Sequence, residues 1–304
     1  MALLMVLLMI ATLATIVVAT QEQWFHVFGR SRTLQQQLKD KWLLLSAESV
    51  MVHHYSALLS APVMAPSLAG RQPDLQSDGH TFTVVIRDLQ ACFNLNSLFY
   101  LAEKKEAREK ERRGEAQDAD QPPRPFPEQI FLRLLIATGS DETVAEQILS
   151  QIKESAQISG RMFADISELR AMKSLNRQQW QALAGQLCAL PDTRLRINVN
   201  GLQPSQALLL SALINLPLSA EEVKNLLDTR PKAGWATLEA LKKGQSPQGV
   251  GAQMVKAQAY LALNTEFFEI KIERHGRQLY PLRSWVRRSE EKFNVFRRQF
   301  GMSD

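Results

Sequence analysis

Residues 1–19 form an uncharged and almost wholly apolar run, MALLMVLLMIATLATIVVA. As a helix this run is about 28 Å long, which matches the hydrocarbon core of a bilayer. We therefore predict a transmembrane segment over residues 1–20, with no cytoplasmic tail in front of it. Such a segment restricts the chain to the few classes of protein that begin inside a membrane.

The helical pattern continues past this segment. Apolar or small residues recur at three- and four-residue steps, which is the spacing of one helix face. No Pro occurs before Pro62, and Gly29, next to Arg30 and Ser31, is the one place where the helix could bend. We predict a single helix in which residues 21–60 pack on one side against a folded domain. The alternative is an anchor followed by a separate helix. The face consists of Leu34, Leu38, Trp42, Leu45, Ser49, Val52 and Ser56.

Segments with strand character lie at two places far apart in the sequence. The first is a β-branched run over residues 81–88, which follows an Asp78-Gly79 turn signal. The second covers residues 265–300, where Phe268, Ile270 and Ile272 alternate with charged residues and two further strands follow. These strands must meet across the intervening chain to form one sheet.

The chain between these strands has a helical pattern from Glu128 to about Ala262. Asp141 stands where it could cap one of the helices. A weak internal echo relates Asn94-Leu95-Asn96 to Asn198-Val199-Asn200, and residues 160–169 to residues 234–241. It predicts two related helical units. The Asn side chains are expected to serve local backbone, turn and cap positions.

The predicted class is therefore α+β: a long N-terminal helix, with a transmembrane first third, packed on an antiparallel sheet with a large inserted all-helical domain. Residues 103–127 are crowded with charges of both signs and then with Pro, so we expect an exposed loop there. The predicted parts are 1–20 (transmembrane), 21–60 (rest of the long helix), 61–100 (first part of the sheet domain), 101–262 (inserted helical domain) and 263–304 (C-terminal strands).

Nothing in the sequence indicates catalysis. None of the usual nucleotide, metal or hydrolase motifs is present, and the paired carboxylates Asp141-Glu142 and Glu221-Glu222 stand at helix starts, where the helix dipole explains them. We predict that the chain is not an enzyme and binds no cofactor. The net charge is +5. An arginine cluster near the C-terminus is expected on an exposed sheet face or an interface edge, with an acidic partner as the functional alternative: Arg283, Arg287, Arg288, Arg297 and Arg298.

Three interpretations of the N-terminus compete: a secretory signal peptide, an ordinary anchor, and the processed end of a pilin-like subunit. The chain resembles the K subunit of the bacterial type II secretion system, the large minor pseudopilin. The resemblance rests on the Met1-Ala2-Leu3-Leu4 start and on the ACFNLN and LPDTRLRINVN segments. Most pilin-like proteins have Glu at the fifth position, whereas this chain has Met5, as is typical of the K subunit. An unpaired carboxylate in lipid is costly, so losing it suits a terminal subunit that has no neighbour above it.

The resemblance implies a structural role. A K subunit joins the I and J minor pseudopilins through the long helices, initiates assembly and caps the pseudopilus for protein export. It also implies contacts with the major pseudopilin, the inner-membrane assembly platform and the prepilin peptidase, with Met1 as the processed and N-methylated terminus. The location implied is the inner membrane of a Gram-negative bacterium, single-pass, with most of the chain in the periplasm. Helix-packing residues are expected at Leu3, Leu4, Val6, Leu7, Ile10, Leu34, Leu38, Trp42 and Leu45.

Two points stay open at this stage. In an oxidising periplasm Cys92 and Cys188 could form a disulfide, or they could be two buried free thiols. Calcium is associated with pseudopilin loops by resemblance only, and no segment has a recognisable ligand spacing.

The rival function is a membrane-anchored protein for DNA uptake, because residues 198–213 resemble a helix-hairpin-helix module. The matching hairpin around Pro217 lacks the Gly-x-Gly that would present backbone N–H groups to phosphate. Nucleic acid is therefore not an expected partner.

Overall fold

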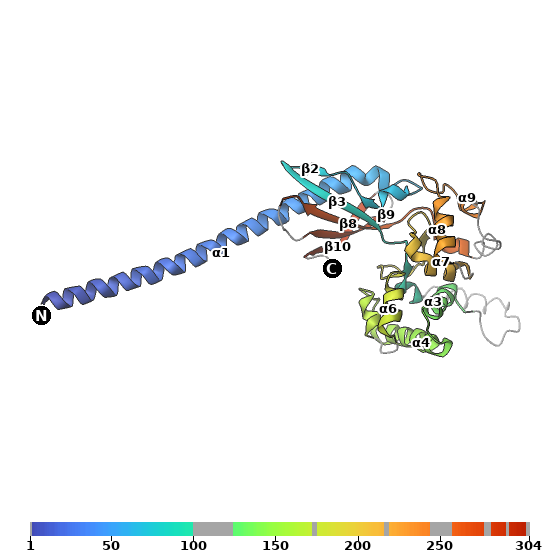
Figure 1. Ribbon diagram of the computed structural model, residues 1–304, viewed down its shortest axis with the longest axis horizontal. Helices are drawn as coiled ribbons and strands as arrows, with labels where there is room; N and C mark the ends of the chain where they lie inside the picture. The colour runs from blue at the N-terminus through green and yellow to red at the C-terminus, as the bar shows by residue number, and fades with distance from the viewer. Residues whose placement is uncertain are drawn as a thin grey trace.

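The computed structural model describes residues 2–99, 124–171, 175–215, 219–243, 257–276, 281–289 and 292–301. A single long helix, α1 (Ala2–Leu59), projects from a folded body that contains a β-sheet and a group of shorter helices (Figure 1). At the standard rise per residue, 58 residues make a helix of about 87 Å. The helix continues through Gly29 without interruption, so the predicted single helix is correct.

The sheet has the antiparallel strand order β1-β3-β8-β9-β10, and β2 pairs with part of β3. Its centre is the pairing of β3 with β8, which joins residues 80–88 to residues 267–274, with Val84 opposite Ile272. The prediction that distant strands meet in one sheet is confirmed. The strand bounds are β1 (Gly70–Arg71), β2 (Leu75–Ser77), β3 (His80–Asp88), β8 (Phe267–Arg274), β9 (Leu282–Ser289) and β10 (Lys292–Phe300).

The C-terminal part of α1 covers one face of this sheet (Figure 1). Period-two alternation in β3, β8 and β9 places every second side chain under the helix, where it is buried. The core between helix and sheet comprises Leu44, Ala47, Met51, Tyr55, Leu59, Met64, Leu68, Phe82, Val84, Ile86, Phe268, Ile270, Ile272, Leu282 and Val286.

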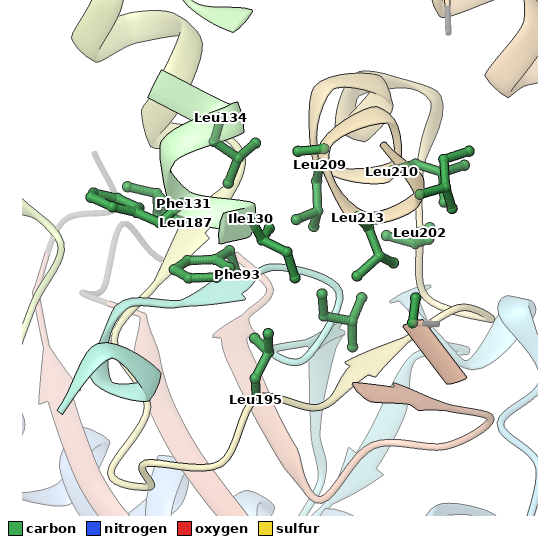
Figure 2. Packing of buried hydrophobic residues seen from close by; sticks show 14 of the residues in the cluster. Phe93, Ile130, Phe131, Leu134, Leu187, Leu195, Leu202, Leu209, Leu210 and Leu213 are labelled. Carbon is green, nitrogen blue, oxygen red and sulfur yellow. The ribbon is translucent and has the colours of Figure 1, made fainter. Parts of the chain in front are cut away.

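A second, separate core lies among the helices. Phe93, at the start of this region, stacks against Phe131 with ring centroids 5.8 Å apart, and leucines of α7 face them (Figure 2). The helices are α3 (Phe126–Ala137), α4 (Glu142–Ser159), α5 (Ser167–Arg170), α6 (Arg177–Ala184), α7 (Ala207–Ile214), α8 (Ala220–Asp228) and α9 (Leu238–Lys243). The described residues also form short 3₁₀ turns: η1 (Pro66–Leu68), η2 (Leu95–Leu98), η3 (Pro204–Gln206) and η4 (Gln258–Tyr260).

The expected boundaries of the helical domain need adjustment. Ala91, Phe93, Leu95 and Leu98 belong to the helical core, so the sheet domain ends near residue 90 and not at 100. At the other end, Leu261 still belongs to the helical core and Phe268 to the sheet core, close to the expected change at 262.

The inserted domain is also not all-helical. Short parallel strand pairs interrupt its described part: β4 (Phe93–Asn94) with β5 (Leu187–Cys188), and β6 (Ile197–Asn198) with β7 (Leu261–Ala262). Two-residue strands carry no usable periodicity, so the sequence pattern could not reveal them. Asp141 does stand at the N-cap of α4, but its side chain makes no capping hydrogen bond. Most of the predicted loop 103–127 falls outside the described residues, and its last residues already begin α3.

The internal echo in the sequence corresponds to a repeated hydrogen-bond pattern. Asn96 donates to the carbonyls of Phe163 and Leu190, at 2.9 and 2.7 Å, and accepts from the Phe163 N–H at 2.8 Å. Asn200 donates to the carbonyls of Trp235 and Leu263, at 3.2 and 2.9 Å, and accepts from the Trp235 N–H at 2.8 Å.

The residues two positions earlier repeat the pattern as well. Asn94 and Asn198 each accept the backbone N–H of the next Asn, at 3.2 and 3.1 Å. The predicted local role of the Asn residues is therefore only part of their function, because these side chains also join segments from 35 to 134 positions apart. The helical domain consists of two related units.

Candidate assembly interface

Most of α1 lies outside the folded body. Among the side chains of α1 whose exposure the structure describes, none from Leu3 to Lys39 is buried, and the first buried residue is Asp40. Large apolar side chains are exposed well beyond the apolar run, including Trp24 at 73%, Phe25 at 76% and Trp42 at 69%. Soluble monomeric proteins rarely expose an apolar surface of this size. The exposed side chains of α1 therefore indicate contact with lipid or with another protein.

The face of α1 that packs on the chain's own sheet is not the predicted one. The buried residues are Leu44, Ala47, Met51, Tyr55 and Leu59, whereas Leu34, Leu38 and Trp42 are exposed. Of the predicted face, Leu45 and Val52 are partly buried and pack at the edge of the sheet core, so the expectation fails for Leu34, Leu38 and Trp42. Both faces carry apolar residues at helical spacing. The face that packs on the sheet also contains two acidic residues, so its sequence pattern did not indicate a buried face.

These acidic residues fasten α1 to the sheet. Glu48, which is 3% exposed, accepts from the Arg298 guanidinium at 2.8 Å and from the Ser284 hydroxyl. Asp40, equally buried, accepts from Arg274 at 2.8 Å. A buried carboxylate is stable only when it is paired, so both pairs fix the position of the helix on the sheet. Sequence reasoning missed them, because the partners Arg274 and Arg298 lie 234 and 250 positions away in the sequence.

Beyond the apolar run, one side of α1 carries a line of apolar side chains and one Ser, which we call the outer stripe: Trp24, Val27, Ser31, Leu34, Leu38, Trp42 and Leu45. Their steps of three and four residues keep them on one side of the helix, and this spacing is that of a helix–helix seam. All seven are exposed except Leu45, which is partly buried. The stripe therefore contains every helix-packing residue that the sequence predicted outside the membrane segment.

The remaining predicted packing residues lie in the apolar segment itself. Leu3, Leu4, Val6, Leu7 and Ile10 are all exposed there, as expected for side chains that face lipid or neighbouring helices. Met1 lies outside the described residues. α1 is the one described helix that is long and apolar enough to cross a membrane.

The arginine cluster does not form a single surface. Arg288 donates to the Leu59 carbonyl at 2.9 Å and Arg298 pairs with Glu48, both on the side of the sheet that α1 covers. Arg283 and Arg297 lie on the other face, where their guanidinium carbons are 5.8 and 4.6 Å from the Trp285 ring centroid. Alternation along a strand separates them.

Cys92 and Cys188 form a disulfide, with Cα atoms 5.8 Å apart. The bond connects the start of the first helical unit to its end, 96 positions later in the sequence. It lies beside the β4–β5 pair, so the same two segments are held by backbone hydrogen bonds and by a covalent bond.

The described residues bring no three His, Cys, Asp or Glu side chains together in a group that could hold a metal ion. Two of the histidines contact other polar side chains: His80 Nδ1 lies 3.1 Å from the Arg274 guanidinium, and His275 Nε2 lies 2.6 Å from the Thr83 hydroxyl. The calcium expectation is untested.

The hairpin of the second helical unit is poorly suited to phosphate. Helix α8 begins with a capping box in which Ser219 and Glu222 satisfy each other's backbone N–H groups. Glu221 stands beside them in the same turn. Carboxylates at a helix start compete with phosphate for the N–H groups and repel it.

An N-terminal apolar helix that packs by its second half on an antiparallel sheet, while its first half is bare, defines a membrane-anchored pilin-like subunit. Comparison with known proteins narrows this class. Sequence profiles of type II secretion system protein K match residues 91–192 and 197–263, which are the two helical units. The chain is 29% identical to the type II secretion system protein K of Klebsiella pneumoniae, over 99% of this chain and 96% of that protein.

Further relatives agree. The corresponding protein of Pectobacterium carotovorum subsp. carotovorum is 28% identical over 99% of this chain and 95% of its own length. Among solved structures, a chain of the GspK-GspI-GspJ complex from enterotoxigenic Escherichia coli matches with a TM-score of 0.67 and 23% identity, over 90% of this chain and 100% of that one. That likeness confirms the fold. The protein belongs to the type II secretion system protein K family, and it is membrane-anchored with a single span.

Proposed function

We propose that this protein is the minor pseudopilin at the tip of the type II secretion pseudopilus. It forms a complex with the I and J minor pseudopilins, initiates assembly in the inner membrane and caps the filament. The major pseudopilin, the assembly platform and the prepilin peptidase are its other partners. The folded body lies in the periplasm of a Gram-negative cell, and the single-pass helix anchors it to the inner membrane.

The outer stripe is the observation that carries this proposal. It is apolar, it continues directly from the membrane span, and its 3–4 spacing matches the packing of one helix against another. The chain's own sheet already uses a different face of α1. Two helices of partner subunits can therefore pack beside α1 without displacing it from the sheet.

The helical domain supports a terminal position. Its two units form a body beyond the sheet, at the end of the molecule farthest from the free end of α1 (Figure 1). A subunit stacked above would have to share that space. Position 5 is Met and not an acidic residue, which also supports a terminal position. A terminal subunit has no neighbouring N-terminal amine with which a carboxylate in lipid could pair.

We further propose a mechanical role without catalysis or a resident cofactor. The DNA-uptake alternative is the weaker candidate, because the hairpin of the second unit presents Glu221 and Glu222. Strong, salt-dependent DNA binding by the full-length protein would reverse this preference.

The test is co-purification of the full-length chain with the I and J subunits of its own secretion system, in detergent. Trp42→Ser and Leu38→Ser should each reduce recovery of the partners at least fivefold, because each removes an exposed anchor of the stripe. Val50→Ser is the matched control, since Val50 is an exposed apolar residue of α1 that lies one position past Ser49 and on a different face. Equal recovery for all variants would contradict the proposal.

A further inference from the structure

The stretch of α1 just past the apolar run has a composition of its own. Trp24, Phe25 and Phe28 are exposed, at 73%, 76% and 54%, and Arg30 and Arg32 follow within one turn. We call these five residues the collar. None of them touches the folded body closely enough to be buried, because burial on α1 begins only at Asp40.

The position of the collar is fixed by helix geometry. A hydrocarbon core of roughly 30 Å takes up about 20 helical residues. A span that begins at Leu3 therefore leaves the core near residue 22. The headgroup layer adds roughly 5 to 7 Å on each side, which is about four more residues of helix. Trp24 and Phe25 then lie within the headgroup layer, and Phe28 lies at its outer boundary.

The chemistry of the collar matches that layer. Tryptophan and other amphipathic aromatic rings concentrate at the membrane–water interface. The Arg32 guanidinium carbon lies 4.6 Å from the Phe28 ring centroid, so the cation is held against an aromatic face. Arginine binds phosphate oxygens in a fork of two hydrogen bonds, and its long stem lets it reach back toward the membrane.

We propose that the collar is a headgroup anchor: the aromatic side chains occupy the interface of the leaflet nearest the folded body, and Arg30 and Arg32 bind lipid phosphates there. This rests on the proposed membrane span but not on any partner subunit. The collar divides the exposed part of α1 in two. Its aromatic half contacts lipid, and only the stripe from Leu34 onward is left for partner helices.

A consequence follows for the height of the body. From Phe28, at the outer boundary of the headgroup layer, to Asp40 the helix rises about 18 Å. The anchor therefore holds the sheet and helical domain about 18 Å above the headgroups. Partner helices can reach the outer stripe in that gap while all the subunits remain in the membrane.

The experiment uses the full-length chain, alone, in vesicles of phosphatidylcholine and phosphatidylglycerol that contain bromine-labelled lipids. Bromine quenches only tryptophans that lie within or next to the bilayer. The chain has five tryptophans, and of these only Trp24 belongs to the collar. Trp24→Phe should abolish at least half of the lipid quenching and retain an aromatic anchor. Trp42→Phe is the control, and it should leave the quenching unchanged.

The arginines are tested in the same vesicles. Arg30→Gln with Arg32→Gln should move Trp24 away from the headgroups, seen as a change in which bromine position quenches it best and as stronger quenching by aqueous acrylamide. Lys39→Gln with Lys41→Gln removes the same charge farther along the helix and should change neither. The proposal is overturned if acrylamide reaches Trp24 as freely as Trp42, or if Trp24 is shielded from both quenchers. Because no partner is present, failure of the pseudopilin complex would not alter this result.

Discussion

Asn96 and Asn200 occupy equivalent places in the two helical units, and both are fully buried. Each amide makes three hydrogen bonds to backbone groups of two separate segments. A buried amide of this kind stabilises only because all its partners are present, and removing it leaves those partners unsatisfied. The repeated Asn-x-Asn is thus the structural signature of the fold in each unit.

Replacing either residue should therefore be severe. We expect Asn96→Ala and Asn200→Ala each to lower the free energy of unfolding by roughly 2 to 4 kcal/mol. Asn294→Ala, at an exposed position of β10, should change it by less than about 0.5 kcal/mol. Urea unfolding of the full-length protein in detergent measures all three. Equal stability of Asn200→Ala and Asn294→Ala would contradict the role assigned to the amide.

Asp88 marks the junction between the sheet and the second helical unit. Burial raises the pKa of Asp88 to about 6, against the opposing effect of hydrogen bonds from the Gln90 N–H, Thr265 and Asn198. The approach is close because residue 201 is glycine: a Cβ there would lie 1.9 Å from the Asp88 Oδ2 atom. The folded state thus binds a proton at Asp88 more readily than the unfolded chain, whose pKa is about 3.9.

This shift has a definite sign. The contribution of Asp88 to stability is complete below about pH 4 and is lost as the pH rises through about 6. We expect the difference in unfolding free energy between wild type and Asp88→Asn to change by roughly 2 kcal/mol between pH 4 and pH 7, in favour of the variant at the higher pH. Urea unfolding over that range measures it. A difference in unfolding free energy that does not vary with pH would show that Asp88 has the same pKa in the folded and unfolded states.

Helix α1 is held to the sheet by one apolar face and by two ion pairs whose carboxylates are buried. Removing one partner of such a pair leaves an uncompensated charge, whereas removing both does not. Arg298→Ala should therefore lower the free energy of unfolding by about 2 kcal/mol, a value reduced because the Arg298 side chain is 45% exposed. The double variant Arg298→Ala with Glu48→Gln should recover part of the loss. If the double variant is less stable than the sum of the two single variants, the pairing is not what holds the helix.

A helix or strand could be predicted from the sequence when many consecutive residues follow its hydrophobic periodicity. The long helix and the strands at residues 80–88 and 267–274 follow unbroken periodicities, and both predictions were correct. The face of α1 that is buried was predicted wrongly, because two apolar faces are present and only tertiary contacts decide between them. The two-residue strands and the ion pairs of Asp40 and Glu48 depend on residues that are distant in sequence, so no local pattern indicates them.

The disulfide acts at the level of the whole helical domain. It closes a loop of 96 positions, and a cross-link of that length constrains the unfolded chain by about 4 to 5 kcal/mol in the entropic treatment. We expect Cys92→Ser with Cys188→Ser to lose a large part of that stability while the sheet and α1 keep their contacts. Thermal unfolding with and without reductant measures the loss. Identical midpoints for the reduced and oxidised protein would contradict the prediction.

At the largest scale the molecule has three zones along one axis: a membrane span with its collar, a bare helix with the outer stripe from Leu34 onward, and a body of sheet and helices. Each zone has its own occupant, which is lipid for the first, partner helices for the second and the chain's own core for the third. This division explains how a protein with so much exposed apolar surface remains ordered in its assembly.

The account depends most directly on the partner of the outer stripe. A photo-crosslinking amino acid placed at position 42 of the full-length chain, in membranes that also contain the I and J subunits, should form adducts with one of them. The same group at position 50 should form few or none, because that face of α1 lies off the stripe. Equal adducts at both positions, or none at position 42 while the three proteins still co-purify, would contradict it.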